Sequence, residues 1–261
     1  MQYKKYQRNH AIVKDREKAL DDFLNSAAVI NGKRVKHKLT HSRNPNSEDA
    51  LTWSCFDTLR NYKSENLIDA LNEILEDSFE GNKPFDFKHE KNVKVKIGKE
   101  YIAPTFIGRK TKNENTEVDA SIETDSKVIF IEAKLYSSIS LPNEIQPHNQ
   151  IANKLRIGLD YARNNKKKFY FIFLDIAPLE KLTLRKSKAE ASQQGSGFTD
   201  KWKSAWWFKY YKDGRNDSIK PLADILRDVT SDKKVLDEMR KNMGWLTWAS
   251  LFKITLRAAI K

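Results

Sequence analysis

Cysteine is nearly missing from this sequence, because Cys55 is the single one in 261 residues. A lone thiol excludes an internal disulfide and any zinc site built from several cysteines. Cys55 lies in an apolar stretch with helical spacing, so we expect it to be a small buried side chain.

Long apolar runs are missing as well. The longest one extends from Phe169 to Leu174, far short of the about 20 residues that cross a bilayer as a helix. The first residues, from Met1 to Arg8, also lack the apolar segment of a secretory signal peptide. These absences predict a cytoplasmic protein without a membrane partner.

Several catalytic signatures are not found either. The chain has no GxxxxGK[ST] segment that could hold the phosphates of ATP, and no serine in a Gly-x-Ser-x-Gly setting. Its five histidines, His10, His37, His41, His89 and His148, are scattered. His37 and His41 are four residues apart, but they lie in the basic stretch before the first expected core helix, where we expect surface or substrate-facing side chains.

Acidic side chains are few compared with basic ones. The sequence has 35 Asp and Glu against 48 Lys and Arg, which gives a formal net charge of +13. A strongly basic protein is expected to meet a polyanion, with nucleic acid as the first candidate. A generally lysine-rich surface would give the same total, so charge alone assigns no function.

Hydrophobic spacing predicts helices and strands in a definite order. The expected elements are a helix near 13–27, helices from Asn46 or Ser47 to 60 and over 65–76, strands at 85–87 and 93–97, a hairpin over 119–135, a helix over 143–164 and a strand over 169–176. Further helices are expected after Pro221 and from about Trp245. This order indicates α/β layering around a mixed sheet.

Composition divides the chain into a basic N-terminal helical extension over 1–45, a core over 46–178, and a basic, aromatic-rich C-terminal region over 179–261 that we expect to pack on the core. The last region contains Trp202, Trp206, Trp207, Phe208, Tyr210 and Tyr211. These rings could stack on bases, but such density is more typical of a buried core, which we favour. Arg185, Lys186 and Lys188 are better candidates for phosphate contact.

The most informative segment has an acidic residue on one short strand and a glutamate and a lysine on the next. Asp119 precedes a turn at 123–126, and Glu132, Ala133 and Lys134 end the following strand. Side chains alternate along a strand, so Glu132 and Lys134 share one face while Ala133 points to the other. The turn brings Asp119 beside Glu132. This convergence predicts a metal site with a catalytic lysine.

A Glu and a Lys two residues apart on a strand often form only a solvated pair. Here the preceding segment, Val128 to Ile131, is apolar on both faces. Charges at the end of such a strand cost free energy unless they are paired or bind a metal. Glu123 and Asp125 fit the turn and need no further role, and Glu117 is expected to face solvent or a cation elsewhere.

Asp119, thirteen residues before Glu132 and followed by Ala133 and Lys134, resembles the motif of the PD-(D/E)xK nuclease superfamily, which includes restriction endonucleases, repair nucleases and resolvases. Val118 stands where the motif has proline. The superfamily core is a helix, a three-strand meander, a crossover helix and a further strand, and the order expected over 48–176 matches it. The resemblance implies a restriction-endonuclease-like α/β core over 46–178, with a central mixed β-sheet flanked by helices and helical additions at both ends.

The resemblance also implies roles for named residues. Asp119 and Glu132 are expected to bind Mg²⁺ through carboxylate oxygens, with the backbone carbonyl of Ala133 as a further ligand and Mn²⁺ as a substitute ion. Lys134 is expected to orient or deprotonate the attacking water and to help stabilise the transition state.

Two supporting residues follow from the same resemblance. Glu48, at the start of the first core helix, fits a glutamate that joins the metal site in many members. The alternative is that Glu48, like Asp49, simply favours the helix dipole. Gln150 fits a glutamine on the helix after the lysine strand, and is preferred to Gln146 because the proline at 147 marks the helix start. A solvated helical amide is the alternative for Gln150.

The function that this resemblance implies is a Mg²⁺-dependent endonuclease hydrolysing DNA phosphodiester bonds, as a restriction or related defence nuclease. Double-stranded DNA is the expected partner. Many nucleases of this kind cut both strands as dimers, so a homodimer is also expected from the resemblance. Two alternatives stay open, a catalytically inactive DNA-binding module of the same fold and a nuclease directed at RNA.

Overall fold

The computed structural model describes residues 10, 15–25, 28–30, 33–35, 38, 47–102, 115–135, 148–176, 207–208, 210–212 and 222–260, and at 28–30 and 33–35 the backbone alone. Its helices are α1 (Glu17–Asn25), α3 (Glu48–Arg60), α4 (Ser64–Ser78), α5 (Gln150–Asn164), α8 (Leu222–Ile225), α9 (Lys233–Lys241) and α10 (Trp248–Ile260), with a short 3-10 helix η2 (Phe87–His89). Its strands are β1 (Ala28–Ile30), β2 (Lys33–Val35), β3 (Lys94–Tyr101), β4 (Thr116–Glu123), β5 (Lys127–Ala133), β6 (Lys168–Asp175) and β7 (Met243–Thr247).

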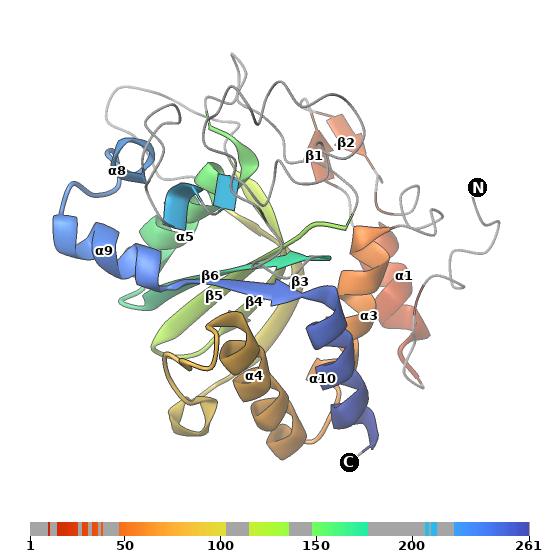
Figure 1. The fold of residues 1–261 in the computed structure, drawn as a ribbon. Coiled ribbons are helices and arrows are strands. Elements are labelled where there is room, and N and C mark those ends of the chain that lie inside the picture. Colours follow the sequence, from red (N-terminus) through yellow and green to blue (C-terminus); the bar gives the residue numbers. More distant parts are fainter. Residues whose placement is uncertain are drawn as a thin grey trace.

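Within these described residues, a five-stranded mixed sheet has the order β3-β4-β5-β6-β7 (Figure 1). The pairs β3–β4 and β4–β5 are antiparallel, whereas β5–β6 and β6–β7 are parallel. A parallel pair needs a crossover connection, and α5 lies between β5 and β6 in the chain. The strands β1 and β2 form a separate small antiparallel pair.

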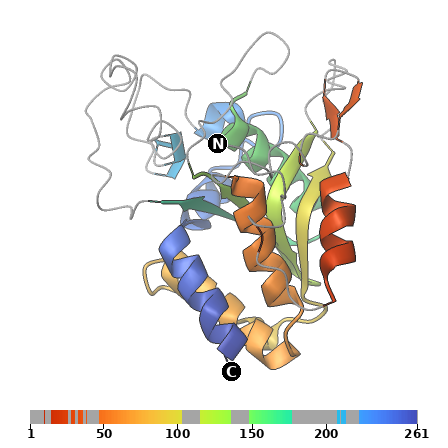
Figure 2. The ribbon, with the colours of Figure 1, turned by 90° about the vertical axis from the view of Figure 1, so that its right-hand side faces the viewer.

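Helices cover both faces of this sheet. The helices α5, α8 and α9 lie on one side, and α3, α4 and α10 lie on the other (Figures 1 and 2). Because both faces are covered, the central strands β5 and β6 are buried along almost their whole length, which explains their unbroken apolar sequences. The chain is thus α/β, with a mixed sheet flanked by helices, as the sequence predicts.

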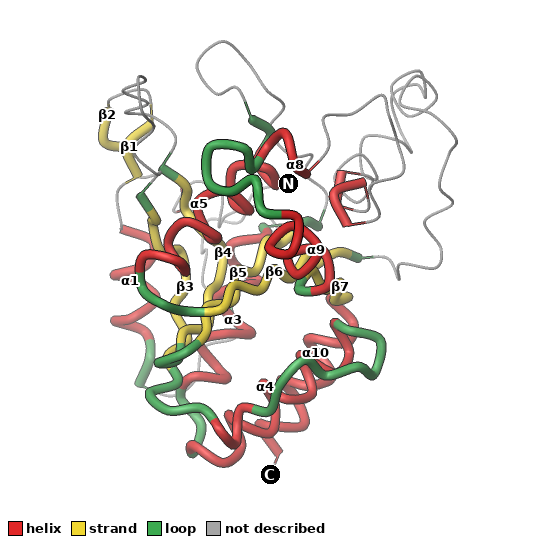
Figure 3. Tube along the Cα trace, turned by 90° about the vertical axis from the view of Figure 1, so that its left-hand side faces the viewer, coloured by secondary structure: helices red, strands yellow, loops and turns green. Residues whose placement is uncertain are grey.

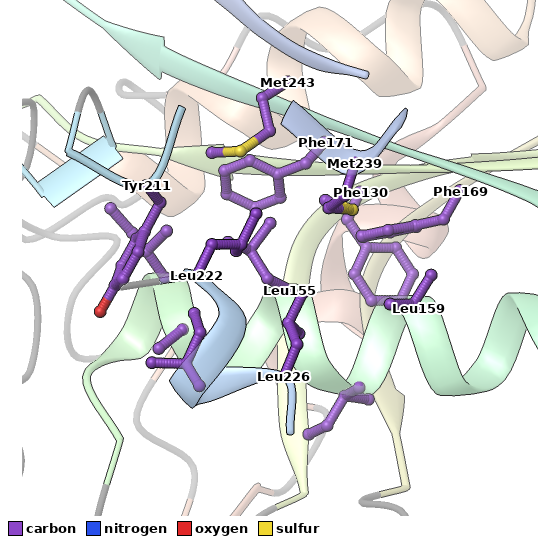
Figure 4. Close-up of a cluster of buried hydrophobic side chains, with 14 of the residues drawn as sticks. Phe130, Leu155, Leu159, Phe169, Phe171, Tyr211, Leu222, Leu226, Met239 and Met243 are labelled. Carbon is purple, nitrogen blue, oxygen red and sulfur yellow. The ribbon is translucent and has the colours of Figure 1, made fainter. Parts of the chain in front are cut away.

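Two apolar clusters fill the space between these layers. The first packs Leu155 of α5 against Phe130, Phe169 and Phe171 of the sheet (Figure 4). The second packs apolar side chains of α3, α4 and α10 on the opposite face. On that face α4 and α10 lie side by side (Figure 3), and ion pairs such as Lys253–Asp77 join them. The sheet is therefore a rigid platform for the groups at its strand ends.

The predicted aromatic core is confirmed for the aromatic residues that the structure describes in the segment 202–211. Phe208, Tyr210 and Tyr211 are buried in the first cluster, and Trp207 packs against it. The Tyr211 hydroxyl accepts a hydrogen bond from Asn149 Nδ2 at 2.8 Å. Trp202 and Trp206 lie outside the described residues, as do Arg185, Lys186 and Lys188.

Several predicted elements differ from the structure. The expected strand at Phe85 is wrong, because residues 87–89 form a 3-10 helix whose N-terminus is capped by the Asp86 side chain. The helix expected from about Trp245 is present as α10, but it begins at Trp248, because Trp245 lies within β7. Parallel pairing with β6 buries β7 as the fifth strand, a tertiary effect that overrides the local pattern.

Glu123 has a larger role than the turn position expected for it. Its buried carboxylate accepts hydrogen bonds at 2.9 Å from Lys99 Nζ and at 2.7 Å from the Tyr101 hydroxyl, and it lies 2.9 Å from Lys96 Nζ. Burial alone would raise the pKa of Glu123, but the hydrogen bonds from these neighbours outweigh it and lower the pKa to about 2. The carboxylate of Glu123 on β4 thus pairs with the ammonium groups of Lys96 and Lys99 on β3.

No described helix is both long and apolar enough to pass through a membrane. The longest of the described helices, α4 and α5, have 15 residues each and carry charged side chains. A chain crossing the hydrocarbon core of a bilayer as a helix needs about 20 residues.

Candidate functional site

The hairpin of β4 and β5 brings Asp119 and Glu132 together. Its register places Ala120 opposite Ile131, so the next position along the ladder places Asp119 level with Glu132. The backbone ladder ends at the pair Ala120–Ile131, and the next contact between the strands is made by the Asp119 side chain. Its Oδ2 accepts a hydrogen bond at 2.7 Å from the backbone N–H of Ala133. The carboxylate of Asp119 is thereby held against the segment Glu132 to Lys134.

Asp119 also lies at an irregularity in its strand. Val118 and Ala120, two residues apart, are buried in the apolar clusters on opposite sides of the sheet, which regular alternation would not allow. The register of β3 with β4 puts Gly98 opposite Asp119, and Gly98 has a φ of +62°. This left-handed residue permits the local change of direction at which the Asp119 side chain leaves the sheet.

Glu132 lies at the end of β5 and Lys134 directly follows the strand, and their side chains meet as the alternation predicts. Glu132 is fully buried, and its Oε1 lies 3.0 Å from Lys134 Nζ. This contact is an ion pair without hydrogen-bond geometry, so Oε1 has no hydrogen-bond partner among the described residues. The side chain of Ala133 is buried in the cluster on the other face, so that Ala133 can contribute to the site by its backbone alone.

The backbone around Lys134 is fixed from two sides. Its N–H donates to the carbonyl of Leu174 on β6 at 2.7 Å, and its carbonyl accepts a hydrogen bond from Trp248 Nε1 of α10 at 3.0 Å. The backbone that carries the Lys134 side chain is therefore held between the sheet and helix α10. A side chain anchored in this way is well positioned for chemistry.

Glu48 reaches the same place from the start of α3, 87 residues earlier in the chain than its partner Leu135. Ser47 caps the helix by accepting a hydrogen bond from the Ala50 N–H, which fixes the first turn. Oε1 of Glu48 accepts a hydrogen bond from the Leu135 N–H at 2.7 Å, and Oε2 lies 3.6 Å from Lys134 Nζ. The structure therefore brings Glu48 together with Lys134.

Lys154 of α5 is a site residue that the sequence analysis missed. It is buried, and its Nζ forms a hydrogen bond and ion pair with Oε2 of Glu132. Burial lowers the pKa of Lys154, against the opposing influence of nearby carboxylates, of which Asp119 is the strongest. A lysine between the apolar core positions Ile151 and Leu155 was the signal that could have identified it.

Gln150 is the first residue of α5, which Asn149 caps by accepting a hydrogen bond from the Ala152 N–H. The helix therefore begins three residues later than Pro147, and Gln146 lies outside the described residues. Gln150 is half-buried and lies one turn before Lys154, on the same helix face. Lys154, one turn later, contacts Oε2 of Glu132.

Glu117, two residues before Asp119, pairs with a cation outside this group. Its Oε1 lies 2.6 Å from Nζ of Lys38, a buried lysine that also lies over the ring of Phe23, with Nζ 4.3 Å from the ring centroid. The pair connects β4 to the N-terminal part of the chain. Glu117 therefore meets a cation elsewhere, one of the two outcomes expected for it.

The donor set suits a hard divalent cation in part. Asp119, Glu48 and Glu132 supply carboxylate oxygens, which Mg²⁺ prefers, and Oε1 of Glu132 is a buried acceptor without a hydrogen bond from any described residue. Among the described residues, however, no three Asp, Glu, His or Cys side chains are grouped as a metal cluster. Lys134 Nζ pairs with both carboxylates, at 3.0 Å from Glu132 Oε1 and 3.6 Å from Glu48 Oε2.

Comparison of the chain with protein-family models, with curated proteins and with solved structures gives no match. The interpretation of the site therefore depends on its own geometry. That geometry consists of three carboxylates and two lysines, which come from the hairpin of β4 and β5 and from the helices α3 and α5.

Proposed function

We propose that this protein is a Mg²⁺-dependent endonuclease that hydrolyses DNA phosphodiester bonds, as a restriction or related defence nuclease. The observation that carries the proposal is the convergence of Asp119, Glu132, Glu48 and Lys134 at one end of the β4–β5 hairpin. A buried carboxylate with an unsatisfied oxygen beside a lysine is costly to maintain. Such a cost is typical of a functional site.

The arrangement of elements supports a restriction-endonuclease-like core. The helix α3 precedes the meander β3-β4-β5, and α5 then leads to β6, parallel to β5. Asp119 lies on β4, Glu132 on β5 and Lys134 directly after β5, an order compatible with the PD-(D/E)xK motif. The match in order and the match in residues are independent of one another, which strengthens the proposal.

Asp119, Glu132 and Glu48 would hold the Mg²⁺ ion, together with the backbone carbonyl of Ala133. When bound, such an ion polarises the scissile phosphate and lowers the pKa of a water molecule. The chain's own contribution is to fix these oxygens. Asp119 is held by the Ala133 N–H, and Glu48 by the Leu135 N–H.

Lys134 is the residue that acts on water and phosphate. Its ammonium has three N–H donors and is held near Glu132 and Glu48 rather than being free in solvent. It orients the attacking water by hydrogen bonding and places positive charge where the phosphorane-like transition state becomes more negative. These two roles do not require Lys134 to ligate the cation.

The net charge of +13 supports nucleic acid as the substrate. Basic side chains that neutralise phosphates release counterions from DNA, so affinity falls steeply as salt rises. Double-stranded DNA is the proposed partner, and two copies of the chain would cut both strands. RNA is the alternative substrate, and a cleavage assay on both nucleic acids separates the two possibilities.

The test is cleavage of matched duplex DNA, methylated duplex DNA and RNA, with Mg²⁺ or Mn²⁺ and with EDTA. The wild type is expected to cut DNA only with a divalent cation. Lys134→Met is expected to lower the rate about 10²- to 10⁴-fold, the usual contribution of a general acid–base group. Lys127→Met, on the same strand but paired with Glu90 at its far end, is the matched control and keeps activity.

Two results would contradict the proposal. Equal cleavage by wild type and Lys134→Met would remove the role of Lys134 and point to a contaminating nuclease. Tight, salt-dependent DNA binding without cleavage of any substrate would instead favour the catalytically inactive binding module. Sedimentation of the protein with and without duplex DNA would then test whether two copies assemble on the substrate.

A further inference from the structure

Lys154 contacts the candidate site but has no role in the proposed mechanism. It lies on the sheet-facing side of α5, between the fully buried residues Ile151 and Leu155. Its Nζ bonds to Oε2 of Glu132, a carboxylate that is itself 0 % exposed. An ammonium and a carboxylate have thus both been removed from water at the centre of the candidate site.

Such a pair is expensive to bury. Two charges taken out of water lose their hydration free energy. Only a well-aligned contact between them offsets that loss. An apolar residue at this core position of α5 would avoid that loss entirely. Packing alone therefore does not explain a lysine at this position. The group that its ammonium contacts is Glu132.

The two oxygens of Glu132 have different surroundings. Oε2 is held by Lys154, whereas Oε1 lies 3.0 Å from Lys134 Nζ and has no hydrogen-bond partner among the described residues. One oxygen is thus fixed and the other is left for a further ligand. The side chain of Glu132 is positioned through its Oε2.

We propose that Lys154 is a built-in counter-cation of Glu132, which holds this carboxylate in place without a metal and weakens its binding of a divalent cation. The proposal rests on the proposed function, because it assigns Glu132 to the cation site. Lys154 acts through Glu132 and is a positioning residue. Its positive charge repels an incoming cation, while it keeps the site folded when that cation is not bound.

Close packing of α5 on the sheet supports this assignment. Gly158, one turn after Lys154, faces Phe169 and Phe130, and a Cβ at Gly158 would overlap the ring of Phe169. The helix can therefore approach the sheet closely at this point. That approach brings the backbone of α5 near enough for Lys154 to reach Glu132 from within the core.

The test measures cation binding, independently of cleavage. Mn²⁺ and Mg²⁺ are titrated into nucleic-acid-free wild type, Lys154→Met and Lys127→Met, by calorimetry and by the shift of the melting temperature. Lys154→Met is expected to melt at a lower temperature in EDTA, and to bind Mn²⁺ at least tenfold more tightly than the wild type. Lys127→Met is expected to bind Mn²⁺ as the wild type does.

A second set of variants tests the proposal in case Lys154→Met alone does not fold. Glu132→Gln leaves Lys154 buried without its counter-charge, so it is expected to lower the melting temperature in EDTA. Adding Lys154→Met to Glu132→Gln is expected to restore much of that loss and to leave no response to Mn²⁺. A double variant no more stable than Glu132→Gln would show that the two side chains are not coupled, and would overturn the proposal.

The outcomes separate this proposal from the nuclease assignment. Unchanged Mn²⁺ affinity in a folded Lys154→Met variant would overturn the counter-cation while leaving DNA cleavage as it is. Tighter Mn²⁺ binding without cleavage of any nucleic acid would support the counter-cation and contradict the nuclease. The two readouts are therefore independent.

Discussion

The backbone N–H of Ala133 donates a hydrogen bond to Oδ2 of Asp119 across 2.7 Å, and this bond connects β5 to β4 at the end of their ladder. An amide side chain in place of the carboxylate can still accept this hydrogen bond, but it carries no charge. Asp119→Asn and Asp119→Ala therefore separate the structural role of this residue from its proposed role as a metal ligand.

For Asp119→Asn we expect a melting temperature close to that of the wild type and a loss of cleavage of about 100-fold or more, since metal ligation supplies several kcal/mol and each 1.36 kcal/mol is tenfold in rate. Asp119→Ala is expected to lose cleavage and stability together, because the Ala133 N–H then loses its acceptor. Full activity of Asp119→Asn with Mg²⁺ would exclude the carboxylate as a ligand.

Glu48 and Asp49 are neighbours in the first turn of α3, and the resemblance favours Glu48 as the site residue. The structure places Glu48 against Leu135 and Lys134. Glu48→Gln keeps an acceptor for the Leu135 N–H but removes the charge of a proposed cation ligand, so it is expected to lower the cleavage rate about 100-fold or more. Asp49→Asn is the matched control, because both changes remove one negative charge from the same helix start. Equal losses in cleavage would indicate a general dipole effect instead.

Gly98 lies opposite Asp119 at the irregular position of β4. A Cβ at Gly98 would overlap Lys38 Nζ and lie 3.1 Å from the Phe23 ring. Lys38 is buried and paired with Glu117, so it cannot move aside without breaking that ion pair. Gly98→Ala is therefore expected to perturb both the N-terminal contact and the position of Asp119.

The matched control is Gly81→Ala. Gly81 also has a positive φ, of 80°, but a Cβ there meets no described atom within 4 Å. Both variants are expected to lose about 1–2 kcal/mol of unfolding free energy through backbone strain. Gly98→Ala is expected to lose about 1–3 kcal/mol more through overpacking, and part of its cleavage activity. Urea unfolding curves measure the difference, and equal losses would contradict the packing role of Gly98.

Periodicity predicted those parts of the fold in which one local signal dominates. The Ser47 cap and the apolar face of α3 are local, as is the alternation that puts Glu132 and Lys134 on one face. The hairpin register follows from its short turn, so the approach of Asp119 to Glu132 was also predictable. These features need no knowledge of distant segments.

Other features depend on contacts between distant segments. The residues of β7 read as a helix start until β6 pairs with them, and Phe85 reads as a strand although no strand partner lies beside it in the described sheet. The position of Lys154 between core residues indicates burial, but its contact with Glu132 depends on the close packing of α5 at Gly158. Residues whose role comes from tertiary burial are those that a local pattern does not predict.

Glu123 belongs to the same class and gives the protein a predicted acid sensitivity. Hydrogen bonds from Lys99, Tyr101 and Lys96 lower its pKa to about 2 from an ordinary value of 4.5. A carboxyl group with a lowered pKa stabilises the fold fully above the pKa of the unfolded chain, and this contribution is lost as the group is protonated. The expected loss therefore occurs as the pH falls from about 4.5 to about 2.

Glu123→Gln is expected to cost about 1.5–3 kcal/mol at pH 7, the range for hydrogen bonds to a charged group, and to flatten the dependence of stability on pH in this window. Glu238→Gln is the control, since Glu238 pairs with Lys168 at 2.7 Å while 53 % of its side chain is exposed. Exposed pairs contribute little, so this variant should follow the wild-type curve. Urea unfolding at pH 7, 5, 4 and 3 measures all three proteins. If wild type and Glu123→Gln lost stability in parallel below pH 4.5, the acid sensitivity would have to come from other carboxylates.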